Sequence, residues 1–134
     1  PITFKAIDNT GVDIYHTNVM MCIAKTFAVV CLESVTVHED KAKLIGSLIK
    51  TNKEIVDISL QQLNHYAGNM LQVINEEGEL LLIMSTQAYQ SLTNAQIEIL
   101  QKHNRIIHSS LNTIESVGGG SARCMMAEVF LLKK

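Results

Sequence analysis

Cys124 follows a run of glycines near the end of the chain, and this setting makes it a candidate nucleophile. The glycines at residues 118–120 allow backbone angles that other residues resist, and their N–H groups could cradle a developing negative charge. A thiol becomes a useful nucleophile where a positive neighbour, a histidine or backbone dipoles favour the thiolate. Taken alone, a cysteine after glycines is more often a small apolar residue beside a turn.

His16 and Asn18 form a second candidate group. Residues 14–24 are predicted to be a strand, in which alternate side chains share one face, so His16 and Asn18 are expected to point the same way. A histidine and an amide at the polar tip of an apolar strand could supply a general base and a hydrogen bond to a substrate. The alternative, in which His16 caps the strand and Asn18 satisfies a loop, is commoner for such residues.

The other sulfur-containing side chains are predicted to lie in the core. Cys22 and Cys31 stand inside apolar runs. The same is predicted for four methionines, Met20, Met21, Met125 and Met126. The three cysteines contain no close pair and the five histidines have no metal-ligand spacing, so we predict no disulfide, metal or cofactor. Reduced thiols favour a cytoplasmic setting.

Length and composition indicate one globular domain. The chain has 134 residues, of which 47% are hydrophobic and 18% charged, enough apolar material to build a core. Its formal net charge of -2 and dispersed lysines and arginines disfavour a nucleic-acid partner. Its apolar runs have the length of strands, so no membrane span is predicted. The chain starts in an apolar stretch without a methionine, as if cut from a longer protein.

The elements that must position these residues are predicted in two similar sets. The first set is three strands, a helix and a strand, at residues 2–7, 14–24, 27–32, 38–50 and 55–58. The second set is two strands, two helices and a strand, at residues 69–74, 79–84, 86–91, 93–103 and 105–108. A turn at 75–78 is predicted between the strands, and Thr93 with Gln96 is predicted to form a capping box. Residues 121–132 are predicted to be a further strand.

These sets suggest a repeat of ββαβ units. Asn18, Asn69 and Cys124 stand at equivalent places, just ahead of apolar stretches that contain methionine, and a little over fifty residues separates each from the next. Repeats of this length are typical of propeller blades or solenoid units, which need neighbours to bury their faces. The units are predicted at residues 14–58, 67–108 and 121–134, and two units and a fragment cannot close a ring.

Three motifs resemble a known family. His-Thr-Asn-Val-Met-Met at 16–21, Asn-His-Tyr-Ala-Gly-Asn-Met-Leu at 64–71 and Gly-Gly-Gly-Ser-Ala-Arg-Cys-Met at 118–125 are similar to the C-terminal half of the amidinotransferase and arginine deiminase superfamily, the penteins. The most similar branch is the arginine-deiminase-related hydrolases linked to citrulline use. The resemblance implies an α/β-propeller of five ββαβ blades around a channel. About two and a half blades are expected here, so residues 1–134 would be a single C-terminal part of a pentein domain.

The resemblance also implies a mechanism. Cys124 would attack the guanidinium or ureido carbon, and His16 would protonate the leaving amine and then activate water. Asn18 stands where deiminases of this superfamily carry an aspartate, which favours a neutral ureido group such as that of citrulline over the cation of arginine. Asn69, Ser121 and Arg123 are predicted, with Asn18, to bind the substrate.

The resemblance leaves other outcomes open. The family's acidic partners come from the N-terminal half, so we expect a fragment with little or no activity alone. Its exposed strand edges predict a homo-oligomer or association with the missing half. An amidinotransferase, or a non-catalytic binding module that kept the fold, are the alternatives.

Overall fold

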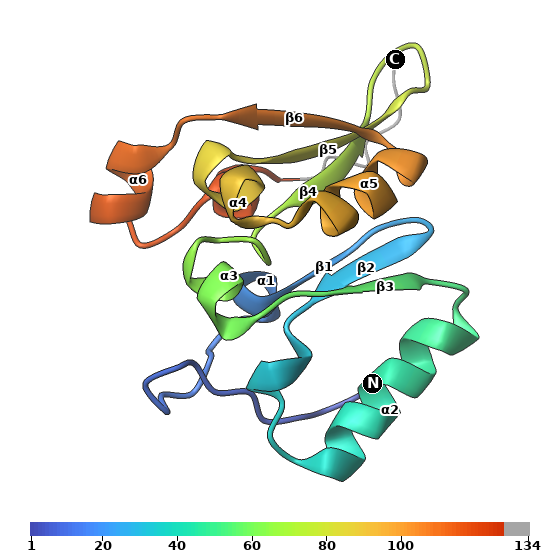
Figure 1. Ribbon diagram of the computed structural model, residues 1–134, viewed down its shortest axis with the longest axis vertical. Coiled ribbons are helices and arrows are strands. Elements are labelled where there is room, and N and C mark those ends of the chain that lie inside the picture. Colours follow the sequence, from blue (N-terminus) through green and yellow to red (C-terminus); the bar gives the residue numbers. More distant parts are fainter. Residues whose placement is uncertain (128–134) are drawn as a thin grey trace.

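Two three-stranded sheets of the same topology make up the fold (Figure 1). The computed structural model describes residues 1–127. The first sheet contains β1 (Met21–Ile23), β2 (Phe27–Val30) and β3 (Glu54–Asp57). β1 is antiparallel to β2 and β2 is parallel to β3, with Met21 opposite Val30 and Val29 opposite Val56. Helix α2 (His38–Lys50) makes the crossover between the two parallel strands.

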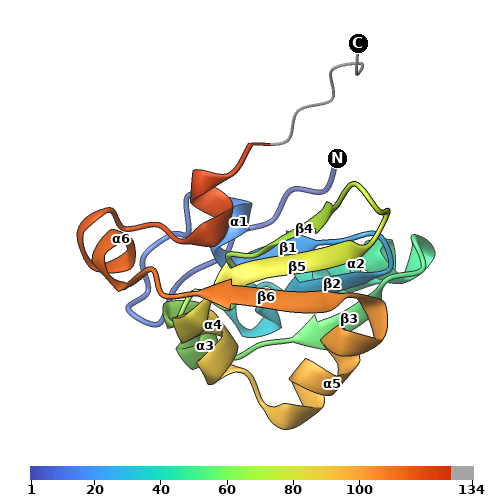
Figure 2. The same ribbon diagram turned by 90° about the horizontal axis from the view of Figure 1, so that it is seen from above.

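The second sheet repeats this arrangement. It contains β4 (Leu71–Ile74), β5 (Leu80–Ser85) and β6 (Arg105–Ser109), with the first pair antiparallel and the second parallel. Its crossover contains two helices, α4 (Thr86–Ser91) and α5 (Asn94–His103). Viewed from above, the two sheets overlap (Figure 2).

Short helices occupy the connections. They are α1 (Thr17–Met20), α3 (Leu60–Asn64) and α6 (Asn112–Val117), with the 3-10 turns η1 (Leu32–Ser34) and η2 (Ala122–Met125). The sequence pattern predicted neither α3 nor α6. Within residues 1–127, none of the helices has the length and apolar content needed to cross a bilayer.

The core is centred on β2, whose four residues are all fully buried. Burial on both faces requires a continuous apolar strand, which Phe27–Val30 provides. Leu44 and Leu48 of α2 are buried one turn apart, and helical spacing leaves the charged positions outside. Residues from both sheets join one hydrophobic cluster, including Leu82 of β5 and Leu100 of α5. The two units therefore pack as one body.

Polar contacts also join the units. His103 at the end of α5 forms hydrogen bonds through both ring nitrogens. Its Nδ1 is bonded to Thr26 Oγ1 at 2.8 Å, and its Nε2 to Glu54 Oε2 at 2.8 Å. Gln96 Nε2 donates to the carbonyl oxygen of Asp57 at 2.7 Å. The backbone N–H of Lys25 donates to Gln72 Oε1 at 2.9 Å. These bonds fix the edge of one sheet against the other.

Several predicted elements are confirmed. The helices predicted at residues 38–50 and 86–91 have those bounds. The strands predicted between residues 27 and 108 begin and end within a few residues of the predicted bounds. Thr93 Oγ1 accepts the backbone N–H of Gln96 at 3.2 Å, and Gln96 Oε1 accepts that of Thr93 at 2.8 Å, which is the predicted capping box. Cys22 and Cys31 are buried, as predicted.

Three predicted strands are wrong. Residues 2–7 make only an isolated bridge, between Ile7 and Asp13. Within residues 14–24 only Met21–Ile23 form a strand, and Thr17–Met20 form α1. The backbone of this helical turn packs closely on Gly68, where a Cβ atom would lie 2.5 Å from the carbonyl oxygen of Val19. Residues 122–125 form η2, and the remainder of the strand predicted at 121–132 lies outside the described residues from 128 onward. Met125, predicted in the core, is 49% exposed.

Candidate active site

Cys124 lies in η2, directly after the glycine run, and it is exposed. Gly119 has a φ of 65°, in the left-handed region that favours glycine. A Cβ atom on Gly120 would lie 3.2 Å from Cys124 Sγ, so the absence of a side chain leaves room for the thiol. Two of the glycines therefore matter for Cys124: Gly119 supplies a backbone angle that other residues resist, and Gly120 leaves space beside the sulfur.

The segments that precede β1 and β4 both reach Cys124. Asn69 Nδ2 donates to Cys124 Sγ at 3.1 Å and to the carbonyl oxygen of Asn18 at 2.9 Å. Asn18 Nδ2 makes a longer contact of 3.9 Å with the same sulfur. The backbone N–H of Arg123 donates to Asn69 Oδ1 at 3.0 Å. Asn69 and Cys124 are 55 positions apart in the sequence, so distant parts of the chain meet at this thiol.

His16 precedes α1 and is exposed, with its ring centroid 4.8 Å from that of Tyr15. The expectation that His16 and Asn18 share the face of a strand is wrong, because His16 is extended whereas Asn18 lies within α1. No hydrogen bond joins His16 to Cys124 among the described residues. The two predicted catalytic side chains are therefore not hydrogen-bonded to each other in the part of the chain that the structure describes.

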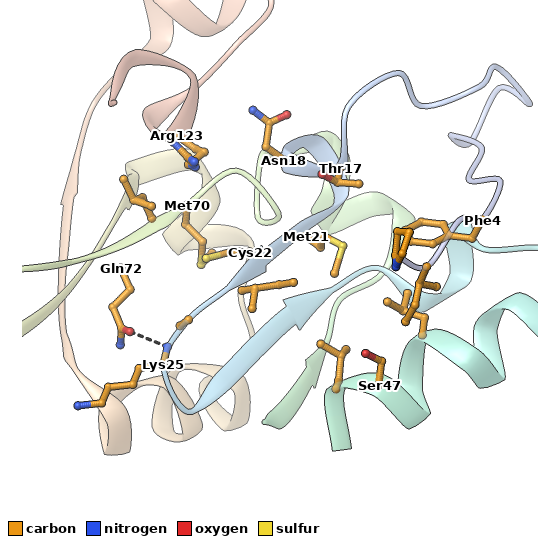
Figure 3. Close-up of a pocket in the computed structure, with 17 residues that line it drawn as sticks. Phe4, Thr17, Asn18, Met21, Cys22, Lys25, Ser47, Met70, Gln72 and Arg123 are labelled. Carbon is orange, nitrogen blue, oxygen red and sulfur yellow. Dashed lines mark hydrogen bonds between the residues drawn. The ribbon is translucent and has the colours of Figure 1, made fainter. Parts of the chain in front are cut away.

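A cavity of about 800 Å³ lies beside these residues, between the segments of β1 and β4. Figure 3 shows Asn18 and Arg123 at one end of it and Met21, Met70 and Gln72 along its length. Asn18 Oδ1 is buried and has no hydrogen-bond partner among the described residues. Arg123 Nη1 donates to the carbonyl oxygen of Met126 at 3.1 Å. Of the predicted substrate-binding residues, the structure thus places Asn18 and Arg123 on this cavity.

Ser121 and Asn69, also predicted to bind the substrate, point elsewhere. Ser121 is fully buried, and its hydroxyl donates to Glu115 Oε1 at 2.6 Å. Asn69 is 2% exposed and its side-chain amide bonds to other parts of the chain. Both residues hold the segment that carries Cys124.

Glu115 and Tyr66 lie near the segment of Cys124; the sequence reasoning did not single out Glu115, and it favoured a turn over a site for Tyr66. Glu115 is 6% exposed, and its Oε2 has no hydrogen-bond partner among the described residues. The Tyr66 hydroxyl donates to the Glu115 carbonyl oxygen at 2.8 Å. A signal for Glu115 was available, because it is the only acidic residue between Glu98 and Glu128. Tyr66 has a φ of 63°, an unusual conformation that only the folded structure reveals.

The environment of Tyr66 raises the pKa of its hydroxyl above the ordinary value of 10.0. Burial is the main cause, and the negative charges of Glu115 and of ionised Cys124 and Tyr15 add to it. Tyr66 therefore remains a neutral hydrogen-bond donor across the physiological pH range. Among the described residues, no group of three or more His, Cys, Asp or Glu side chains could hold a metal ion.

The fold and these positions define a class of protein. The chain is similar to the crystal structure of ArgZ, an arginine dihydrolase from the ornithine-ammonia cycle in cyanobacteria, with a TM-score of 0.66 at 16% sequence identity. The similarity covers 92% of this chain and 17% of the ArgZ chain. This similarity shows that the chain shares the fold of ArgZ.

The family follows from a second comparison. Residues 1–131 match a family model described as N,N dimethylarginine dimethylhydrolase, eukaryotic, so the chain belongs to that family. A search of curated proteins found no match. The family resemblance predicted from the three motifs is thereby confirmed at the level of the superfamily.

Proposed function

We propose that this chain carries the nucleophile and the general base of a cysteine-dependent hydrolase acting on guanidino or ureido compounds. The observation that carries the proposal is the meeting of Asn18, Asn69 and Cys124 beside the 800 Å³ cavity. Asn18 lines the cavity and contacts Cys124 Sγ at 3.9 Å, so it connects the cavity to the thiol. The matched family is named for dimethylarginine and ArgZ is an arginine dihydrolase, and both names support the same class of substrate.

The proposed reaction has two stages. The Cys124 thiolate forms a bond to the guanidinium or ureido carbon, and the amine on that carbon leaves with a proton supplied by His16. Water then attacks the same carbon and gives its proton to His16. The carbon–sulfur bond breaks, and the thiolate is restored. His16 has no hydrogen bond to Cys124 among the described residues, which suits a base that acts on the amine and the water rather than on the thiol.

A neutral ureido group, such as that of citrulline, fits Asn18 better than a cation does. The uncharged amide of Asn18 can donate from Nδ2 to a carbonyl oxygen, and its unpartnered Oδ1 can accept from an NH₂ group once this buried atom turns toward the cavity. An aspartate would instead attract a guanidinium. Asn18→Asp is therefore expected to raise the ratio of guanidino to ureido turnover by about tenfold. A ratio that stays constant would contradict the proposed role of Asn18.

The two sheets are proposed to be two blades of a five-bladed propeller around a channel that includes the cavity. The chain spans 17% of the length of ArgZ, so activity is proposed for a complete ring. The further blades would come from the rest of a longer protein or from association with other copies. We further propose that this protein acts in the cytoplasm, where the thiols of Cys22, Cys31 and Cys124 would stay reduced.

The direct test is turnover by the full-length protein with Cys124 or His16 replaced. Cys124→Ala is expected to lower kcat by about a thousandfold or more, and His16→Ala by about a hundredfold or more. His38→Ala is the matched control, because His38 is also exposed but begins α2, outside the site. Full turnover by Cys124→Ala would end the nucleophile assignment. Product analysis with an added acceptor amine would separate hydrolysis from amidino transfer.

A non-catalytic binding module is the second candidate function. It is favoured by one observation: the cavity is lined by Asn18 and Arg123, whereas neither Cys124 nor His16 is among the described residues that line it. In that case a citrulline or arginine ligand would bind in the cavity and be recovered unchanged. Binding measured by calorimetry, together with product analysis after prolonged incubation, distinguishes this function from hydrolysis.

A further inference from the structure

The side chain of Asn69 forms all its hydrogen bonds with two neighbouring segments, those that contain Asn18 and Cys124. Its two Nδ2 protons go to the carbonyl oxygen of Asn18 at 2.9 Å and to Cys124 Sγ at 3.1 Å. Its Oδ1 accepts the backbone N–H of Arg123 at 3.0 Å. A substrate could take an Nδ2 proton only by displacing one of these partners. Asn69 is thus committed to the protein itself.

The orientation of this amide is fixed by its partners. Exchanging Nδ2 and Oδ1 would place an oxygen against the Asn18 carbonyl and an NH₂ group against the Arg123 N–H, which would leave like groups facing each other. The backbone is also held, because the Asn69 N–H donates to the Tyr66 carbonyl oxygen at 2.8 Å and Gly68 packs against Val19. The side chain is 2% exposed. The N–H that faces the sulfur therefore cannot turn away.

We propose that Asn69 is a positioning residue that holds the sulfur of Cys124 and stabilises it as the thiolate. The inference rests on the proposed function, in which Cys124 is the nucleophile. A hydrogen bond to an ion is about twice as strong as one between neutral groups, so this N–H favours the thiolate over the thiol. Asn18 contributes less to the same sulfur, because its contact is 3.9 Å long. The two asparagines therefore have different proposed roles: Asn69 stabilises the nucleophile, and Asn18 binds the substrate.

The test is the rate at which iodoacetamide alkylates Cys124 in the full-length protein, followed by peptide mass spectrometry. Asn69→Asp preserves shape and the acceptor for Arg123 but replaces the donor by a carboxylate oxygen. We expect alkylation at pH 7 to slow by at least about tenfold and the rate–pH profile to move to higher pH. Because the new carboxylate would itself repel the thiolate, the neutral variant Asn69→Ala is measured beside it and should move the profile in the same direction, which a purely structural role would not do. An unchanged rate and profile in a folded variant would overturn the proposal.

Asn104→Asp is the matched control. Asn104 is also a buried asparagine, with Nδ2 donating to the Leu100 carbonyl oxygen at 2.6 Å and Oδ1 accepting from Gln72 at 2.8 Å. The same substitution there should cost stability without changing the alkylation of Cys124. Equal slowing in both variants would show a general loss of structure and would count against a specific role for Asn69.

A second measurement needs no variant of Asn69. In the unmutated protein, the Nδ2 proton resonance of Asn69 that faces the sulfur is expected to shift when Cys124 is alkylated, whereas those of Asn104 should not. Absence of any shift would overturn the proposal even if Asn69→Asp fails to fold. Alkylation requires no turnover, so these results stand apart from the proposed function, which fails if Cys124→Ala keeps its activity or if no hydrolysis product is found.

Discussion

The segments that enter β1 and β4 differ, although the two sheets have the same topology. Ahead of β1, the helical turn α1 leaves Asn18 half-buried beside the cavity with an unpartnered Oδ1. Ahead of β4, a tight turn through Tyr66 and Gly68 buries Asn69 and directs its amide to Cys124. Equivalent positions of a repeat have thus acquired different tasks. One asparagine faces the cavity, whereas the other holds the thiol.

The crossovers differ as well. α2 starts at His38 after Val37, which offers no side-chain cap, whereas α5 starts after Thr93 with a complete capping box. In the second unit, Gln96 of that box also donates to the carbonyl oxygen of Asp57 in β3. The capping box therefore joins the second unit to the first. Predictions can weaken or sharpen this contrast, beginning with the largest effect.

Replacing Gly68 should cause the largest loss of stability. A Cβ atom there would lie 2.5 Å from the Val19 carbonyl oxygen and 2.7 Å from the Met20 carbonyl carbon, both of them backbone atoms. Gly68→Ala is expected to lower the free energy of unfolding by about 3 kcal/mol. Gly46→Ala is the control, because Gly46 lies within α2 with open space around it and should gain about 0.5 kcal/mol. Urea denaturation measures both, and equal stabilities would show that the two segments do not need this close approach.

Truncating the two asparagines should separate their roles. Asn69→Ala leaves the Asn18 carbonyl oxygen and the Arg123 N–H without their partner, at a cost of about 2 kcal/mol. Asn18→Ala removes only the 3.9 Å contact and should change stability by less than about 0.5 kcal/mol. Thermal unfolding followed by circular dichroism compares them. A larger loss for Asn18→Ala than for Asn69→Ala would contradict the division of tasks.

Alkaline pH should destabilise the first unit through Cys31. Burial raises the pKa of this thiol above its ordinary value of 9.0. Above pH 9 the unfolded chain therefore loses the proton while the folded chain keeps it, and stability falls as pH rises, by at most about 1.4 kcal/mol per pH unit. In the first unit Cys31 directly follows the central strand β2, whereas in the second unit the central strand β5 ends in buried Ser85, whose hydroxyl does not titrate in this range.

Cys31→Ala tests this assignment. The variant should be less stable at pH 7 but should lose less stability between pH 8 and pH 10.5 than the unmodified chain. Some alkaline loss should remain, because the pKa of Tyr66 is also raised. Parallel pH profiles for the two proteins, measured by urea denaturation, would assign the loss to other groups.

The smallest effects should come from the helix starts. Thr93→Ala removes the cap of α5 and is expected to cost about 1 kcal/mol. Val37→Thr supplies a cap to α2 at a site that is 46% exposed and is expected to gain about 0.5 kcal/mol. Opposite signs in thermal unfolding would support the contrast between the crossovers, and a gain from Thr93→Ala would refute it.

Local patterns in the sequence were sufficient for most regular elements. Helix α2 follows from apolar residues at helical spacing, and α5 follows from Thr93 and Gln96, because capping and periodicity act within a few residues. The family resemblance likewise followed from three short motifs, which place Cys124 after its glycines and His16 before Asn18.

The tertiary structure alone decided the conformation of residues 17–20 and the tasks of the asparagines. Those residues were predicted to continue a strand, but they form α1, whose backbone at Val19 and Met20 packs against Gly68. Whether an amide faces a cavity or a thiol depends on partners more than fifty residues away, such as Asn69 on Cys124. Local propensity amounts to a few tenths of a kcal/mol per residue, whereas a backbone overlap or an unpartnered buried amide costs several times as much, so packing prevails at such positions.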